Sequence, residues 1–143
     1  MAVSELQIGE FLAALGERTP APASGAACAL TGAFAASLAE LAARFAEDET
    51  AIARAKALST RLTQLADEDA AAYTAFMETR SEEARRRTID VPEEIAAKAD
   101  EVERLAGHVR AQLTSSVAGD AEAAEELARA AARVARRLAE LNA

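Results

Sequence analysis

Alanine constrains the fold of this chain more than any other feature. It occupies 41 of the 143 positions, and charged residues are spread among the alanines rather than gathered in blocks. Alanine has the highest intrinsic helix propensity. Glycine and proline are scarce, at 6 and 3 residues, and no segment alternates with the period of two that a strand requires. The sequence therefore predicts an all-α protein and argues against β-sandwiches, barrels and Rossmann folds.

Apolar residues three and four positions apart predict about five helices in an antiparallel bundle. A capping box of Ser4 and Gln7 opens a short first helix, which ends at Gly16. Four long helices are expected at about 24–46, from Glu47 onward, after a break or kink at Asp90–Pro92, and from an N-cap at Asp120. No linker or internal repeat divides the chain, so residues 1–143 are expected to form one domain.

Two of the expected helices carry a row of residues along one face, here called a stripe, that is expected to pack against a neighbouring helix. In the second helix, small residues recur at a spacing that lets another helix approach closely, at Gly25, Ala29, Gly32 and Ala36. In the last helix, a stripe of larger residues is expected to face the bundle: Leu127, Ala131, Val134, Leu138 and Leu141.

The charge balance limits the classes of partner. The formal net charge is −8 and the pI is about 4.8, which argues against nucleic acid and anionic membrane surfaces. Residues 19–39 carry no charge over 21 positions, but Pro20 and Pro22 interrupt them and favour a buried soluble helix over a membrane span. The single cysteine, Cys28, excludes an internal disulfide and predicts a cytoplasmic location. Glu5 and Glu10 stand where a secretion signal would need basic and apolar residues.

Few residues offer metal or nucleotide chemistry. Cys28 and the single histidine, His108, lie 80 positions apart, and the chain has no Glu-x-x-His pair, phosphate-binding loop or dinucleotide fingerprint. We therefore expect no metal, and we interpret His108 as a surface residue.

Asp69 is the most informative single residue. It occupies a position of the third helix at which the neighbouring stripe residues, such as Leu62 and Leu65, are apolar. A carboxylate there must be paired, hydrogen-bonded or protonated, which suits either a catalytic acid or base or a structural partner of another helix end. Tyr73, one turn later, is the only tyrosine. The run Arg85–Arg87 either attracts an anionic ligand or forms a solvated face neutralised by Glu82–Arg86 and Glu83–Arg87 pairs.

A longer motif points to a known family. The segment Thr19-Pro-Ala-Pro-Ala-Ser-Gly-Ala-Ala-Cys-Ala-Leu-Thr-Gly-Ala33, after the short helix Gly9–Leu15, resembles the Pro- and Gly-rich loop and the long Ala-rich helix of the cyclodeaminase/cyclohydrolase family. This family includes the C-terminal domain of formiminotransferase-cyclodeaminase and bacterial methenyltetrahydrofolate cyclohydrolases. Further similar elements follow in the same order: Asp69-Ala-Ala-Ala-Tyr73, Val91-Pro92, Asp120 and Asn142.

The resemblance implies an all-helical homodimer that binds a folate and closes or opens the methenyl bridge of tetrahydrofolate. It implies a proton carrier, for which we expect Asp69 first and Asp120 second, and no metal. It also implies that the ligand contacts Pro22, Ser24, Gly25, Tyr73 and Asn142.

The chain departs from the family pattern at the loop. Ala23-Ser24-Gly25 stands where the family has three glycines, and Ala26 stands where it has a serine. Glycine permits a close approach of backbone to ligand that alanine and serine make more costly. The alternative prediction is therefore a non-catalytic helical homodimer that kept the fold and lost the site. A generic helical interaction module is a weaker alternative, because it would give no function to the loop at residues 19–25, here called the Pro-loop.

Overall fold

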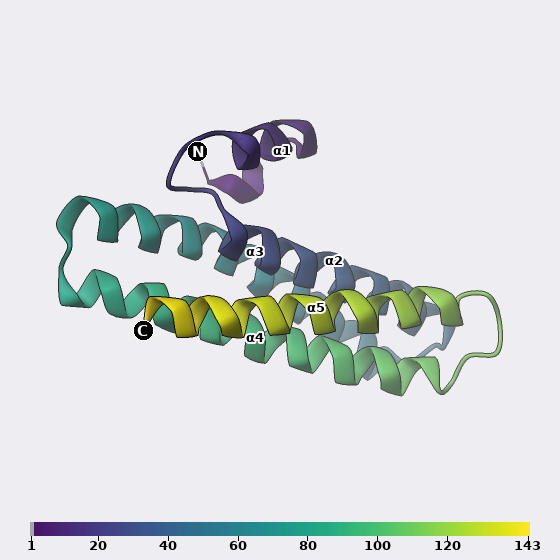
Figure 1. Ribbon diagram of the computed structural model, residues 1–143. Helices are drawn as coiled ribbons and strands as arrows, with labels where there is room; N and C mark the ends of the chain where they lie inside the picture. The colour runs from purple at the N-terminus through teal and green to yellow at the C-terminus, as the bar shows by residue number, and fades with distance from the viewer. Residues whose placement is uncertain (1) are drawn as a thin grey trace.

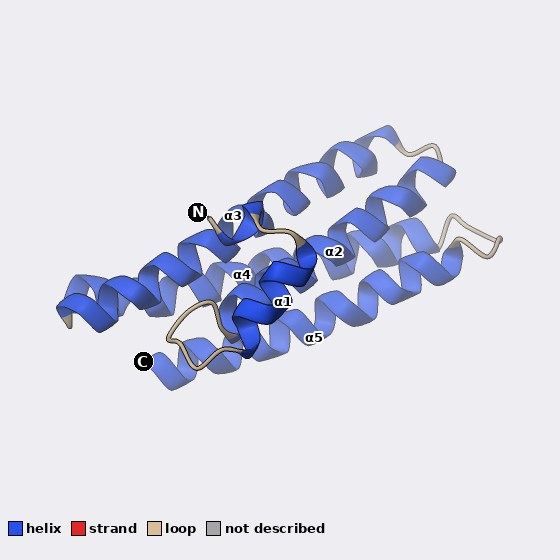
Figure 2. Ribbon diagram, turned by 90° about the horizontal axis from the view of Figure 1, so that it is seen from above, coloured by secondary structure: helices blue, strands red, loops and turns tan. Residues whose placement is uncertain are grey.

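The computed structural model describes residues 2–143, which form five α-helices and one short 3₁₀ helix. In chain order these are η1 (Val3–Glu5), α1 (Ile8–Gly16), α2 (Ser24–Phe45), α3 (Glu49–Thr79), α4 (Glu82–Arg110) and α5 (Ala118–Asn142). Helices α2 to α5 lie side by side as an antiparallel bundle, and α1 lies outside them across α2 (Figure 1 and Figure 2). The prediction of an all-α bundle is confirmed, since residues 2–143 contain no strand.

The core is built largely from alanine, with Leu58, Leu62 and Leu65 of α3 among its few large buried side chains. The small residues of α2 pack against α3 of the same chain. A Cβ added at Gly32 would lie 3.2 Å from Leu62 Cδ1, and the Ser59 hydroxyl donates to the Ala33 carbonyl oxygen at 3.5 Å. The close helix contact expected of these residues is therefore present within the subunit. Helix α2 is also long and apolar enough to cross a membrane, but it lies in the core of the bundle.

The break between α3 and α4 lies ten residues before the predicted one. Arg80 adopts the left-handed conformation, with φ 53°, and Ser81 caps α4 by accepting from the Ala84 N–H at 3.1 Å. Helix α4 then continues through Pro92. Of the break or kink predicted at Asp90–Pro92, the break is therefore wrong, because α4 continues through this segment. Proline removes one backbone hydrogen bond, and the structure supplies a replacement from Asn142, described below.

Two predicted helix starts also differ. Ser4 does not cap α1. It lies in η1, where its N–H and hydroxyl donate to the Asp67 carboxylate at 2.9 and 2.5 Å, and Gln7 takes the N-cap position. Asp120 lies in the first turn of α5, whose N-cap is Val117. The local pattern is ambiguous because an acidic residue is favourable anywhere in the first turn.

The predicted stripe of α5 largely faces outward. Leu127, Val134 and Leu141 are exposed, whereas Ala131 is buried and Leu138 is partly buried against the core. The buried face of α5 otherwise consists almost entirely of alanines. Alanines let neighbouring helices approach too closely for larger side chains to fit between them. Leu127, Val134 and Leu141 are thereby left on the outer surface.

Candidate functional site

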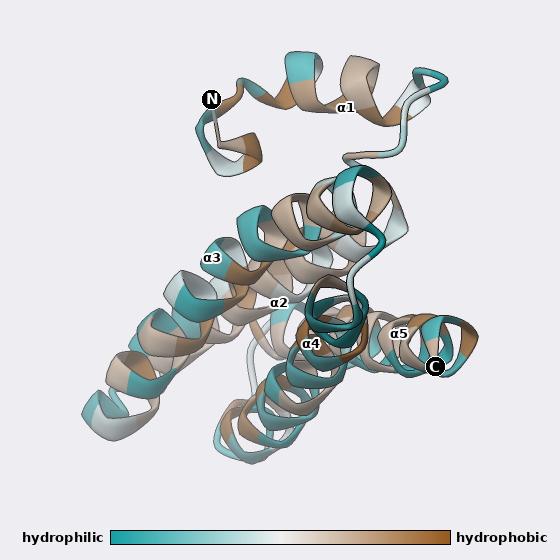
Figure 3. Cartoon of the chain, turned by 90° about the vertical axis from the view of Figure 1, so that its left-hand side faces the viewer, coloured by the Kyte–Doolittle hydropathy of each residue, from teal (hydrophilic) through white to brown (hydrophobic). Residues whose placement is uncertain are grey.

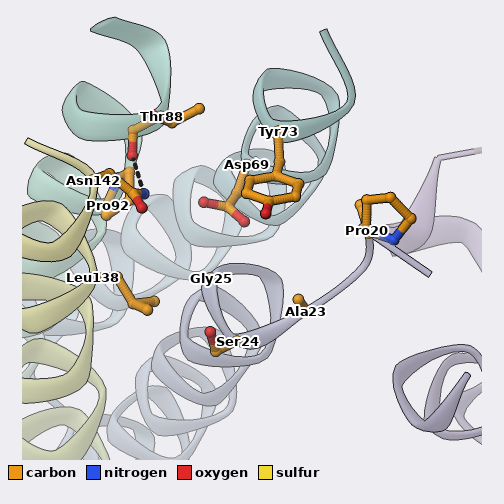
Figure 4. Close-up of a pocket in the computed structure, with 11 residues that line it drawn as sticks. Pro20, Ala23, Ser24, Gly25, Asp69, Tyr73, Thr88, Pro92, Leu138 and Asn142 are labelled. Atoms are coloured by element: carbon orange, nitrogen blue, oxygen red, sulfur yellow. Dashed lines mark hydrogen bonds between the residues drawn. The ribbon is translucent and has the colours of Figure 1, made fainter. Parts of the chain in front are cut away.

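A cavity of about 250 Å³ lies at the end of the bundle where α2 begins and α5 ends (Figure 4). The Pro-loop before α2 forms one side, α3 and α4 form others, and the last turn of α5 completes it. Four segments distant in sequence thus converge on one space. Its lining residues are Pro20, Ala21, Ala23, Ser24, Gly25, Asp69, Tyr73, Thr88, Pro92, Leu138 and Asn142.

Asp69 is the only carboxylate of this cavity, and it lies against the first turn of α2. A Cβ added at Gly25 would overlap the Asp69 carboxylate, so the absence of a side chain at residue 25 makes room for the acid. Helix α2 begins without a side-chain cap, since Ala23 stands at its N-cap position. The first backbone N–H groups of a helix have no intrahelical acceptor and carry partial positive charge, which suits a nearby carboxylate or a developing negative charge.

The environment of Asp69 favours its neutral form. Burial raises the pKa of Asp69 to about 6, and the backbone N–H of Ala26 acts in the opposite direction by stabilising the charged form. Cys28 lies one turn after Gly25 in α2 and is 7 % exposed. Burial raises the pKa of its thiol to about 11, and the charge of Asp69 adds to that rise. Asp69 therefore titrates close to neutrality, whereas the Cys28 thiol stays protonated there.

The other polar side chains of the cavity are neutral. Tyr73 lies beside Asp69, one turn further along α3, and Ser24 opens α2 (Figure 4). On the opposite side, Asn142 Nδ2 donates to the Thr88 carbonyl oxygen at 2.9 Å. Apolar surface from Pro20, Pro92 and Leu138 fills the space between them. The cavity thus combines one titratable acid with neutral polar groups and apolar walls, as small-molecule sites commonly do.

The structure brings together most of the residues that the sequence singled out, but not all of them. Ser24, Gly25, Asp69, Tyr73 and Asn142 share the cavity. Pro22 faces a separate hollow on the other side of the loop, together with Asp67. Asp120 lies near the N-terminus of α5, at the far end of the helix from Asn142, and does not line this cavity.

The arginine run is neutralised by carboxylates, although not by the predicted partners. Arg85 pairs with Glu82 at 3.1 Å, Arg86 with Asp90 at 3.0 Å, and Arg87 with Glu68 at 3.2 Å. The predicted Glu82–Arg86 and Glu83–Arg87 pairs are not formed. His108 lies at the opposite end of the bundle with 66 % of its side chain exposed, so its interpretation as a surface residue is confirmed.

Sequence reasoning missed Thr88 and the apolar walls of the cavity. The signal for Thr88 was Pro92 inside an otherwise helical pattern, because a proline leaves the carbonyl oxygen four residues before it without its helical donor. As for metals, no cluster of three or more His, Cys, Asp or Glu side chains suited to holding an ion occurs within residues 2–143.

The comparisons with known proteins identify the family. The family model for formiminotransferase-cyclodeaminase matches residues 7–143. The chain belongs to this family. No curated protein sequence matches it significantly.

The fold agrees with a solved structure of the family. The crystal structure of a formiminotetrahydrofolate cyclodeaminase from Thermotoga maritima superposes with a TM-score of 0.90 at 24 % sequence identity. The match covers 98 % of this chain and 79 % of the other. The family's helical fold is therefore kept in a shorter chain.

Proposed function

We propose that this protein is a folate one-carbon enzyme that closes or opens the methenyl bridge of tetrahydrofolate. The observation that carries the proposal is Asp69, a partly buried carboxylate whose pKa burial raises to about 6, facing a cavity beside the start of α2. A group that titrates near the working pH is an efficient proton carrier. Membership of the formiminotransferase-cyclodeaminase family supplies the substrate class.

In the deaminase direction, N10 of 5-formiminotetrahydrofolate attacks the formimino carbon, and the bond from that carbon to the imino nitrogen breaks. The formimino group enters in its protonated, amidinium form. Asp69 accepts the N10 proton and donates it to the NH₂ group of the tetrahedral intermediate, which leaves as ammonia and gives the 5,10-methenyl cation. In the hydrolase direction, water attacks the methenyl carbon of 5,10-methenyltetrahydrofolate, and Asp69 takes a proton of that water. Asp69 then returns this proton to N5 as the bond from the carbon to N5 breaks, the remaining hydroxyl proton passes to solvent, and 10-formyltetrahydrofolate forms. Both reactions require one positioned proton carrier.

The neighbours of Asp69 support this role. The first turn of α2 offers backbone N–H groups and partial positive charge toward the charged form of the acid. Tyr73 and Ser24 place hydroxyl groups on the same cavity, where they can position a ligand. We assign no role in this cavity to Asp120 or Pro22, since neither lines it.

The alternative is a non-catalytic homodimer that retained the fold. Ala23 and Ser24 favour it, because each places a Cβ on the cavity at a position where the family pattern has glycine. In that case the cavity would hold no folate, although the protein would still assemble.

The absorbance of the methenyl chromophore distinguishes these functions. Purified protein is incubated with 5-formiminotetrahydrofolate, and separately with 5,10-methenyltetrahydrofolate. Enzymatic activity gives a rise or a fall of this absorbance faster than buffer alone, and Asp69→Asn lowers the rate about 10²–10⁴-fold. Glu78→Gln, which neutralises an exposed carboxylate of α3 away from the cavity, serves as the control and leaves the rate unchanged. No rate above buffer with either substrate would leave the non-catalytic alternative.

We also propose a cytoplasmic homodimer in which residues 1–143 act as one domain. The support for assembly is a set of outward apolar side chains, here called the outer apolar face. It comprises Ile8 and Leu12 of α1, Phe34, Leu41 and Phe45 of α2, and Leu127, Val134 and Leu141 of α5. Large exposed apolar side chains on neighbouring helices are typical of an interface between proteins.

A further inference from the structure

Asn142, at the end of α5, reaches across the cavity to α4. Its Nδ2 donates to the Thr88 carbonyl oxygen at 2.9 Å. In an uninterrupted helix this oxygen would accept from the N–H of residue 92, but Pro92 has none. Thr88 is only 6 % exposed, so the carbonyl depends on a protein donor. The side chain of Asn142 therefore replaces the missing backbone bond.

This bond fixes which way the Asn142 amide points. A carbonyl oxygen can only accept, so the NH₂ group of Asn142 must face Thr88 and the side-chain oxygen must point away. Asn142 lines the cavity, and within residues 2–143 no group donates to its Oδ1. Figure 4 shows the amide between Thr88 and the open space of the cavity. The wall opposite Asp69 thus presents an acceptor whose orientation Pro92 and Thr88 determine.

We propose that Asn142 Oδ1 binds an N–H donor of the ligand, and that the carbonyl of Thr88, left without its helical donor by Pro92, locks this acceptor in place. The inference rests on the proposed function, because a reduced pterin ring carries amino and amide N–H donors along one edge. An acceptor on this wall would hold that edge while the folate's one-carbon unit lies toward Asp69. Asn142 is then a positioning residue for the ring.

A purely structural role makes a different prediction. If Asn142 only satisfies the Thr88 carbonyl, Pro92→Ala makes it dispensable, because the substituted alanine supplies a backbone N–H to the same oxygen. If Asn142 also binds the ligand, restoring the backbone bond rescues stability but not affinity. The Pro92→Ala background therefore separates the two roles.

The experiment measures melting temperature and, by calorimetry, the Kd for 5-formyltetrahydrofolate, a stable folate probe. The variants are Asn142→Leu, Pro92→Ala, and Pro92→Ala combined with Asn142→Leu or with Asn142→Asp, which keeps an acceptor. We expect Asn142→Leu to lower the melting temperature in the parent and to have little effect on it in the Pro92→Ala background. In that background Asn142→Leu weakens binding about tenfold, as the loss of one hydrogen bond predicts, whereas Asn142→Asp retains most of the affinity.

The outcomes separate this inference from the proposed function. Equal affinity of Pro92→Ala and Pro92→Ala/Asn142→Leu, in a protein that binds the probe, overturns the role of Asn142 alone. No binding by the parent overturns the proposed function and the ligand contact with it. If Asn142→Leu lowers the melting temperature equally in the parent and in Pro92→Ala, the bond from Asn142 does not replace the missing backbone donor. The inference that Pro92 and Thr88 orient the Asn142 amide is then overturned.

Discussion

The carboxylate of Asp69 occupies the space above Gly25 in which any other residue would place its Cβ. A glycine in the first turn of α2 therefore admits an acid from α3 to the start of that helix. The contact sets both the position of the acid and its partial burial, and burial raises its pKa to about 6. Both the position of Asp69 and its raised pKa therefore depend on residue 25 having no side chain.

Gly25→Ala tests this contact. The added methyl group must displace the Asp69 carboxylate, so we expect a loss of roughly 1–3 kcal/mol in the free energy of unfolding, as overpacking in a filled site predicts. In an Asp69→Ala background this carboxylate is absent, so the same substitution should cost little. Urea denaturation of the two single variants and the double variant measures this coupling.

The matched control is Gly9→Ala, on α1, where an added Cβ meets no atom within 4 Å. It should be neutral or stabilising, since alanine is the better helix former. A Gly25→Ala cost that persists without the Asp69 side chain would show that the overlap with this carboxylate is not its cause.

Asp69→Asn should change stability in a pH-dependent way. The pKa of Asp69 is about 6 in the folded protein and roughly 3.9 in an unfolded chain, so the folded state binds this proton more tightly. The stabilisation from protonation is complete below about pH 4 and is lost as the pH rises through about 6. At pH 8 the charged, partly desolvated acid opposes folding. The amide variant should then be more stable than the parent by roughly 1–2 kcal/mol, allowing for the water that reaches the group.

Urea denaturation of parent and variant at several pH values checks this sign. The difference should shrink toward zero near pH 4, where the parent acid is protonated. An Asp69→Asn variant that is less stable than the parent at pH 8 would mean that the charged carboxylate has a structural partner, which was the other interpretation of its position in the sequence.

The rate of the hydrolase reaction should fall at acidic pH. A general base acts in its ionised form, so kcat/KM should fall about tenfold per pH unit below a pKa of about 6 for Asp69. The measurement follows the loss of methenyl absorbance between pH 5 and 8, with the uncatalysed rate subtracted at each pH. A flat profile over this range would remove Asp69 as the base.

The sequence predicted the helical class better than it predicted where helices begin and end. Alanine content and apolar spacing are local properties, and they determine helix formation directly. Whether Pro92 breaks or only interrupts a helix depends on a donor far along the chain, at Asn142, and no local pattern records that bond.

The orientation of α5 shows that residue spacing alone does not determine which face of a helix is buried. A stripe that contains Leu127, Val134 and Leu141 looks like a core stripe, yet these side chains are exposed and the alanines are buried. Periodicity identifies which residues share a face but not whether the chain itself or a partner covers that face. In an alanine-rich chain the smaller residues can form the core, because they let the helices approach closely.

The outer apolar face predicts a dimer. Helix α1 has nine residues and none of them is buried, although helices this short are marginal without packing partners. Figure 3 shows α1 standing apart from the bundle, with much of its ribbon coloured hydrophobic. Its Ile8 and Leu12 are 68 % and 61 % exposed, and Phe34 of α2 is 58 % exposed. A second copy of the chain would cover these side chains.

Light scattering coupled to gel filtration should therefore give the mass of two chains. Phe34→Glu and Val134→Glu each place a charge on the outer apolar face and should shift the protein toward one chain, because an unpaired charge is costly to bury. Ala97→Glu is the control, since Ala97 is an exposed residue of α4 that does not belong to this face, and it should leave the mass at two chains. A parent protein with the mass of a single chain at micromolar concentration would contradict the homodimer, and α1 would then have to be stabilised by a different partner.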